Sequence, residues 1–445
     1  MINLFKNTKP ETTPDLNRQQ SESSLHQIDS YLSTDVVISE IWYCLSKKWR
    51  KHCSWRTNFL EFFHKNFSNT DYQKLLEDFL HLCKSYKVEQ LKKFQFQFEE
   101  HDFHRLSINS SILGRLFKEA FPYLQTLSLS FVNFRSPIQK DINSLMIVIG
   151  RHLSSLTKLK LSFEGCLLND ACLKMFESKS TGNYLKLTSL ELSLANCSTL
   201  SNKGFVALFN DLTRTLNKLK ILNLNFRKTC INDMSFDKLL CLINQRLLHL
   251  EVLNLDFTGC KDIMGIILNS LVHKTSNSGP QLTRISLILD DCTCLFDKGL
   301  WALGSLFQKH KKTLKNFHMS LNRCKQITER GFKFFIEEYL KSLENLKELE
   351  LDFGMCLKVT DEVLEIFASV LRSFGGLEKL GLSLFACNGI SDKGVKVLGD
   401  EIKKRLVNLK DLKLDFFYTN HVSKQVLNNL LEIFVGLARV NITFI

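Results

Sequence analysis

The chain has 445 residues, of which 44% are hydrophobic and 24% are charged, and its formal net charge is +13 at pH 7. This length suits two or three ordinary domains or one elongated repeat array, and the hydrophobic content supports an extensive core. Only 5 prolines and 19 glycines leave little room for long disordered linkers. The positive charge is spread thinly along the chain, which is poor evidence for nucleic-acid binding.

The chain starts with the polar stretch MINLFKNTKPETTPDLNRQQSES, and no segment approaches eighteen uninterrupted apolar residues. A signal peptide or a membrane-spanning helix needs an apolar stretch. We therefore expect a cytoplasmic protein without membrane contact, whose residues 1–21 form a disordered leader. In that compartment the 14 cysteines are expected to be reduced thiols.

Residues 22–90 are predicted to form a helical cap. The stretch YQKLLEDFLHLCKSY, residues 72–86, has the apolar spacing of a helix that could cover the first strand of a repeat array. Within the same region, Leu25, Ile28, Leu32 and the pair Trp49 and Arg50 resemble an F-box. That small helical module docks on the adaptor of cullin-type ubiquitin ligases, so the resemblance implies a substrate receptor.

The F-box pattern is incomplete in this chain. The opening Leu-Pro is absent, Asp29 replaces an apolar position, and the interval to Trp49 is about two residues longer than the pattern. The alternative interpretation is a plain helical cap, with Lys47, Lys48 and Lys51 on a solvated face.

From residue 91 onward the frame L-x-x-L-x-L-x-(F/L) recurs twelve times. Its first leucines are Leu91, Leu124, Leu156, Leu187, Leu219, Leu250, Leu282, Leu314, Leu346, Leu377, Leu409 and Leu437. Successive copies start 31 to 33 residues apart, except for the last, which starts after 28. A fixed period near 32 predicts one repeat array over residues 91–445.

Each copy begins with the pattern of a strand. In LKELELDF, residues 346–353, Leu349, Leu351 and Phe353 lie two residues apart and share one face, whereas Glu350 and Asp352 lie on the other. A step such as ITERG, VTDEV or ISDKG then suits a helix start, because its hydroxyl can accept a backbone N–H and its carboxylate meets the helix dipole. Helical spacing follows, as in FKFFIEEYLKSL. We expect one strand and one crossover helix per copy.

Parallel strands joined by helices build a right-handed array, and because helices are wider than strands the array must curve with its strands inside. The frame resembles leucine-rich repeat proteins of the long, ribonuclease-inhibitor-like class, and it is similar to arrays found in protists. The resemblance implies an α/β right-handed solenoid with parallel strands on the concave face and helices on the convex face. An additional apolar position after the last leucine sets this chain apart.

A cysteine follows the strand in most copies, where the leucine-rich repeat family has asparagine or cysteine. The resemblance implies a buried column in which each thiol donates a hydrogen bond to the loop that leaves the strand. The predicted members are Cys166, Cys197, Cys230, Cys260, Cys292, Cys324, Cys356 and Cys387. Because a column lacks four converging ligands and suitable Cβ geometry, zinc and disulfides are disfavoured.

No enzyme signature occurs in the chain, and neither a nucleophile nor a carboxylate stands at a telling spacing from His318. We therefore expect no catalytic activity, no cofactor and no metal. Binding through the concave face is the default use of such an array.

Two outward rows of that face supply candidate binding residues. His318, Glu350 and Lys413 lie in the central row, and Asp352 and Asp415 lie two residues further along their strands. Small polar residues dominate these rows and acids gather in the late copies, so nucleic acid is an unlikely ligand.

The strand exits of the late copies carry large apolar residues where earlier copies have polar ones: Met355, Phe385, Phe417 and Tyr418. Together with a rim of acids, this composition is that of an interface. The alternative is that these side chains pack on their own loops. The last copy, LARVNITFI, is a strand that either caps the array or docks a partner along its edge.

We therefore predict a non-enzymatic scaffold that binds a protein partner, with an F-box-like substrate receptor as the alternative function.

Overall fold

The computed structural model describes residues 93–98, 116–121, 123–135, 139–176, 186–265 and 279–443. All of them belong to one compact unit, Phe63–Ile445. The predicted leader, the helical cap and the F-box-like segment lie outside the described residues, so their assignments remain predictions.

Every predicted copy contributes one strand, which begins two residues after its first leucine. The strands form one twelve-stranded parallel sheet in chain order, and each pairs in register with the next. They are β1 (Lys93–Phe98), β2 (Thr126–Phe131), β3 (Lys158–Ser162), β4 (Ser189–Ser193), β5 (Ile221–Asn225), β6 (Val252–Asp256), β7 (Arg284–Ile288), β8 (Asn316–Ser320), β9 (Glu348–Asp352), β10 (Lys379–Ser383), β11 (Asp411–Asp415) and β12 (Arg439–Thr443).

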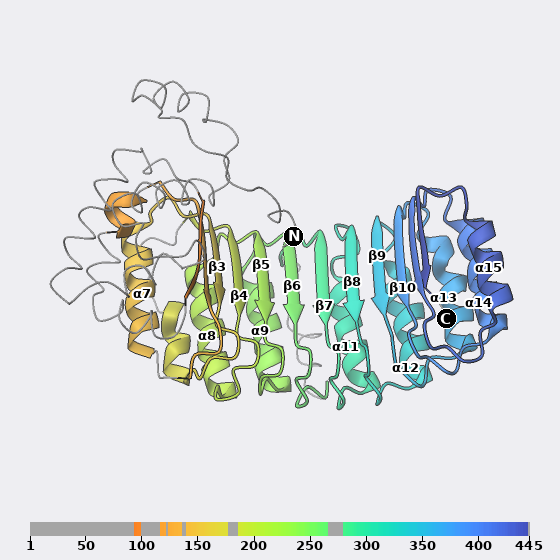
Figure 1. Cartoon of the computed structure of the whole chain (residues 1–445), viewed down its shortest axis with the longest axis horizontal. Helices are drawn as coiled ribbons and strands as arrows, with labels where there is room; N and C mark the ends of the chain where they lie inside the picture. Colours follow the sequence, from red (N-terminus) through yellow and green to blue (C-terminus); the bar gives the residue numbers. More distant parts are fainter. Residues whose placement is uncertain are drawn as a thin grey trace, which may run out of the picture. The chain divides into compact units, whose positions relative to one another are not determined.

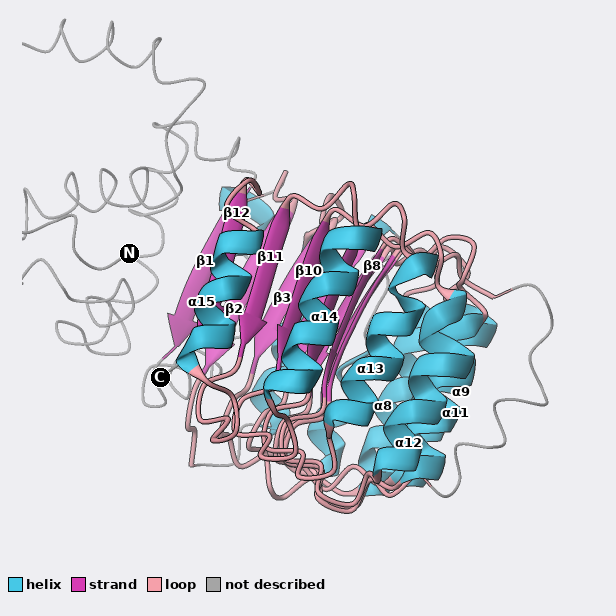
Figure 2. Cartoon of the chain, turned by 90° about the vertical axis from the view of Figure 1, so that its right-hand side faces the viewer, coloured by secondary structure: helices cyan, strands magenta, loops and turns pink. Residues whose placement is uncertain are grey.

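The described helices cover one face of this sheet and leave the other face to the outward strand residues (Figures 1 and 2). The α-helices are α7 (Gln139–His152), α8 (Asn202–Thr215), α9 (Asp233–Arg246), α11 (Asp297–Gln308), α12 (Glu329–Phe334), α13 (Asp361–Val370), α14 (Asp392–Arg405) and α15 (Lys424–Ile433). The expected solenoid with its strand and helix layers is confirmed.

The crossover helix departs from a single α-helix in some described copies. Between β3 and β4 the chain forms the 3-10 helix η3 (Asp170–Phe176), and between β8 and β9 α12 runs into the π-helix η5 (Phe335–Tyr339) and the 3-10 turn η6 (Leu340–Ser342). Shorter helical turns, η2 (Leu116–Ala120) and η7 (Leu371–Ser373), occur elsewhere.

The core lies between the sheet and the helices. Inward strand residues are buried, and the additional apolar position is buried in every described copy from β2 to β11, as at Phe163, Phe226 and Phe353. Rings from adjacent copies contact each other: the Phe131 and Phe163 centroids are 5.0 Å apart and nearly parallel. Burying a phenylalanine stabilises a fold by about 1.5–3 kcal/mol, so this additional position stabilises the stack.

The helix-start acids act between copies rather than within their own helix. The Asp361 carboxylate, at the start of α13, accepts hydrogen bonds from the backbone N–H and the hydroxyl of Ser391, which precedes α14, at 2.8 and 2.5 Å. Asp297 makes the same pair of contacts to Thr328 at 2.7 and 2.6 Å. Each helix start is thus held by the preceding copy.

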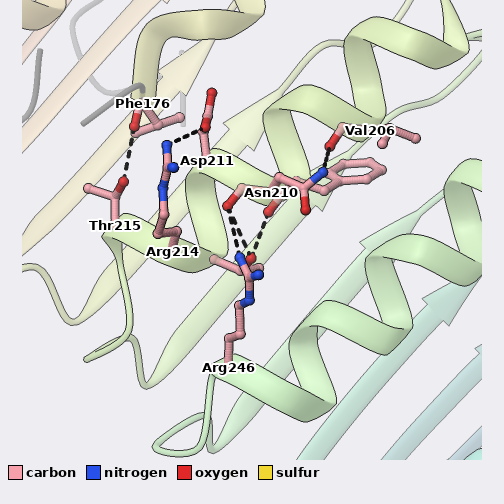
Figure 3. A network of polar contacts seen from close by, with 9 residues as sticks. Phe176, Val206, Asn210, Asp211, Arg214, Thr215 and Arg246 are labelled. Atoms are coloured by element: carbon pink, nitrogen blue, oxygen red, sulfur yellow. Dashed lines mark hydrogen bonds and ion pairs between the residues drawn. The ribbon is translucent and has the colours of Figure 1, made fainter. Parts of the chain in front are cut away.

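The opposite ends of the helices are also joined by polar contacts (Figure 3). The Thr215 hydroxyl at the end of α8 donates to the carbonyl of Phe176 at 3.1 Å, and Arg246 of α9 donates to the carbonyl of Asn210 at 3.5 Å. The first contact satisfies a carbonyl at the end of η3, a group that a helix end leaves without an intrahelical partner, and the second joins the end of α9 to α8.

The last strand, β12, pairs only with β11 among the described residues. Its inward Ile442 is buried, whereas Val440 is half-buried. Whether this copy caps the array or docks a partner remains a prediction.

Candidate functional site

The predicted cysteine column is present, with one member misassigned. Seven thiols each donate to the carbonyl of the additional apolar residue, the last inward position, of the preceding copy, at Sγ to O distances of 3.0–3.4 Å. They are Cys166, Cys197, Cys260, Cys292, Cys324, Cys356 and Cys387, and all are buried. The cysteine is therefore an architectural residue that joins one copy to the next.

Placing Cys230 in the column was wrong. The exit after β5 holds one residue more before its cysteine, so Thr229 takes the column position, buried and donating to the Phe226 carbonyl at 2.7 Å. Cys230 is displaced outward, is half-buried, and donates to the carbonyl of Leu200 instead. Thr419 occupies the same position in the exit after β11. The chain therefore uses both cysteine and threonine in this slot.

Burial raises the pKa of the column thiols from Cys197 to Cys387. The pKa of Cys197 and of Cys387 rises to about 12, and the pKa of Cys292, Cys324 and Cys356 is raised further. Because the thiolate is the form that attacks disulfides and binds metals, these thiols are unreactive in the native array. The cysteines among the described residues are thiols rather than disulfides.

Two surveys of the described residues bear on other functions. No cluster of three or more histidine, cysteine or acidic side chains in them could hold a metal ion. None of their helices combines the length and the apolar character that crossing a membrane requires.

The strand exits share one backbone conformation. An exit is the loop that follows a strand, and its last inward position is the additional apolar residue. The second residue after that position has a left-handed backbone in all ten exits from β2 to β11, with φ between 53° and 73°. Glycine or asparagine occupies four of these ten positions. The other six have other residues, among them Met355, Ala386 and Tyr418. The left-handed turn directs the following column residue back into the core. The sequence pattern did not reveal this shared position.

We expect Ala386→Val to lower the free energy of unfolding by about 1–2 kcal/mol, because a β-branched side chain is disfavoured at positive φ. Urea unfolding followed by circular dichroism measures the loss. Ala386→Gly is the matched control, and it should change the stability by less than about 0.5 kcal/mol because glycine adopts this conformation freely. Equal losses in both variants would show that the backbone conformation is not what matters.

The predicted late-copy residues fall into two positions of the exits. Phe385 and Phe417 are the first residues after the last inward position, whereas Met355 and Tyr418 hold the left-handed position. The structure brings three of them together. The rings of Phe385 and Phe417 stack at 6.0 Å between centroids, and Tyr418 meets them edge-on at 5.8 and 4.3 Å. We call Phe385, Phe417 and Tyr418 the aromatic cluster.

The aromatic cluster is partly open to solvent. Tyr418 is 58% exposed, and Phe385 and Phe417 are half-buried. Met355 is half-buried as well, and its sulfur lies 3.0 Å from Nε of Arg323. The rings thus pack on one another and still present apolar surface.

On the concave face, neighbouring strands place residues about one period apart in contact. The hydroxyl of Ser286 lies 2.9 Å from Nδ1 of His318, and Glu350 is the register partner of His318 on the next strand. The ammonium of Lys379 forms an ion pair with Glu350 at 2.5 Å. Sequence reasoning did not identify these side chains as contacts of His318.

This arrangement is unsuited to catalysis of acyl transfer. The strands β7, β8 and β9 pair with one another along their length, so their backbone N–H groups bond the sheet and are not aimed at a developing oxyanion. The group is better described as a hydrogen-bonded surface row.

The acids of the second outward row, two residues beyond the central row, also accept hydrogen bonds within their own exits. Asp352 and Asp415 accept hydrogen bonds from the backbone N–H groups two residues later, those of Gly354 and Phe417, at 2.8 and 3.1 Å. Asp256 does the same in its own exit. Lys413, in the central row of β11, is exposed.

No protein-family model and no curated protein matches the chain. Among solved structures, one similar chain comes from a complex of Rad7 and Elc1 in yeast, with 18% identity, a TM-score of 0.44 and coverage of 89% of this chain and 96% of that chain. Another is the leucine-rich repeat-containing protein LegL7 from Legionella pneumophila, with 14% identity, a TM-score of 0.41 and coverage of 78% and 99%. The twelve repeats of this chain, and the single parallel sheet that they build, give it the architecture of a leucine-rich repeat solenoid.

Proposed function

We propose that this chain is a cytoplasmic, non-enzymatic scaffold that binds a protein partner through its concave face and the strand exits of its late copies. The observation that carries the proposal is the partly exposed aromatic cluster, which stands where earlier exits hold residues such as Glu164 and Arg227. Aromatic side chains supply large contact areas and are enriched at interface centres. The outward residues His318, Glu350, Lys413, Asp352 and Asp415 would form the polar surroundings of that contact.

The double variant Phe385→Ser with Phe417→Ser is expected to lose the captured partner in an affinity pull-down from the source cell. Because both rings are half-buried rather than core residues, the melting temperature should change little. Phe296→Ser is the matched control, since Phe296 is 42% exposed and precedes α11, away from the late exits. An unchanged partner set with the double variant would contradict the proposal, and a large stability loss would mean that the rings serve the fold.

The same pull-down with a chain that lacks residues 1–90 distinguishes the proposed scaffold from the alternative function, an F-box-like receptor. Recovery of cullin-ligase components only with the full chain would support the F-box-like receptor. The same partner set with both chains would place the binding activity in the repeats.

A further inference from the structure

The aromatic cluster lies beside two carboxylates on the same face of the sheet. Asp352, Ser383 and Asp415 are register partners on β9, β10 and β11, so the two acids flank a small hydroxyl side chain. With neighbouring strands about 4.8 Å apart, the acids lie about 10 Å from each other. Phe385 and Phe417 lie two residues after Ser383 and Asp415, in the exits that follow β10 and β11, and border this row.

Neither carboxylate is neutralised by a cation in the part of the chain that the structure describes. No ion pair there includes Asp352 or Asp415, whose described contacts are to backbone N–H groups and, for Asp415, the Ser383 hydroxyl at 3.5 Å. Nearby cations are engaged or lie one row away: Lys379 pairs with Glu350, and Lys413 lies in the central row. The row beside the rings is thus negative although the whole chain is positive.

Aromatic ring faces and carboxylates attract the same ligand group. A cation above a ring is stabilised by the ring quadrupole, and guanidinium can stack on a ring while it donates to carboxylates in a forked geometry. An acidic or phosphorylated segment would be repelled by both acids. A wholly apolar segment would leave the acids without a cationic partner.

We infer that the partner reaches this site with an arginine-bearing extended segment, whose guanidinium lies over Ser383 between Asp352 and Asp415 and stacks against the aromatic cluster. This inference rests on the proposed function and names the chemistry of the partner. The small side chain of Ser383 leaves room for the incoming group. Arginine is favoured over lysine because a planar fork can address both carboxylates and a ring at once.

The probe is a fluorescein-labelled peptide of glycine and serine with arginine at every third position, and its binding to the full chain is measured by fluorescence anisotropy. The same peptide with glutamate in place of arginine is the control. The arginine peptide should bind and the glutamate peptide should not. Asp352→Asn with Asp415→Asn should weaken binding by about tenfold, as expected for the loss of two charge contacts beside rings.

Ser383→Arg provides a second variant with a different effect. Its own guanidinium would occupy the position between the two acids, so peptide binding should fall at least as much while the melting temperature stays the same or rises. Ser162→Arg, at the same register row on β3, is the matched control and should leave peptide binding unchanged. Equal binding of both peptides, or full binding by the Asn variants, would overturn the inference.

The outcomes also separate the inference from the proposed function. If the ring variants lose the cellular partner while Asp352→Asn with Asp415→Asn retains it, the scaffold function stands and the arginine inference fails. If the ring variants retain the partner, the proposed function itself fails.

Discussion

Raising the pH from about 8 to about 10 is expected to lower the free energy of unfolding by several kcal/mol, because the buried thiols resist ionisation only in the native array. The pKa of Cys197, Cys292, Cys324, Cys356 and Cys387 is raised by burial. Unfolded thiols ionise near pH 8.5–9, so above that pH the unfolded state binds fewer protons and is favoured. Each thiol then costs about 1.4 kcal/mol per pH unit, or on the order of 7 kcal/mol for five thiols at pH 10.

The sign of this effect follows from the direction of the shift. The stabilisation by a raised thiol pKa is complete below about pH 8 and is lost as the pH rises toward the native pKa values. Urea unfolding at several pH values, with reductant present, measures the slope. A flat stability between pH 8 and 10 would contradict the buried column.

Cys292→Thr is the control for the contribution of other titrating groups. The chain itself uses threonine in this slot, at Thr229 and Thr419, so the substitution should be tolerated. It should remove one thiol from the pH dependence and reduce the loss at pH 10 by about 1.4 kcal/mol.

The second large effect is expected from Gly394→Ala, which should lower the free energy of unfolding by about 2–4 kcal/mol. A Cβ at Gly394 would collide with the carboxylate of Asp361. That carboxylate would have to leave Ser391, whose N–H and hydroxyl it holds at 2.8 and 2.5 Å. Two hydrogen bonds to a charged group would be lost, each contributing about 1.5–3 kcal/mol before relaxation. Chemical denaturation of both proteins measures the difference.

A double-mutant cycle isolates the contribution of the carboxylate. In an Asp361→Ala background the carboxylate is absent and the closest remaining contact of the added Cβ is the Cα of residue 361, at 3.2 Å, so Gly394→Ala should be much less destabilising than in the wild-type chain. If Gly394→Ala is equally harmful in both backgrounds, the contact between the two copies is not the cause.

The copies of this solenoid are therefore joined at three levels. The sheet ladder joins the strands, the thiol column joins the exits, and the helix-start acids join the helices. Because these contacts use inward or helix-end positions, most outward residues of the sheet can vary without disrupting them. That freedom lets the late exits carry rings such as Phe385 and Phe417.

The sequence by itself determined the period, the start of each strand and the inward face. These features depend on the local spacing of apolar and polar residues, which differs between a strand and a helix within a few positions. LKELELDF was enough to assign the buried Leu349 and Leu351 of β9. The composition of the aromatic cluster was also visible, since ring residues at Phe385 and Phe417 break the polar pattern of earlier exits.

Only the tertiary structure decided which residues of different copies meet. The additional residue before Cys230 moved Thr229 into the column, the Asp361 carboxylate reached Ser391, and Ser286 met His318. The two pairs, Asp361 with Ser391 and Ser286 with His318, lie about one repeat apart along the chain. The shift at Thr229 depends instead on how its own exit turns. Their contacts arise from the stacking of one copy on the next and from the left-handed backbone of each exit, and the local pattern of a single copy contains neither.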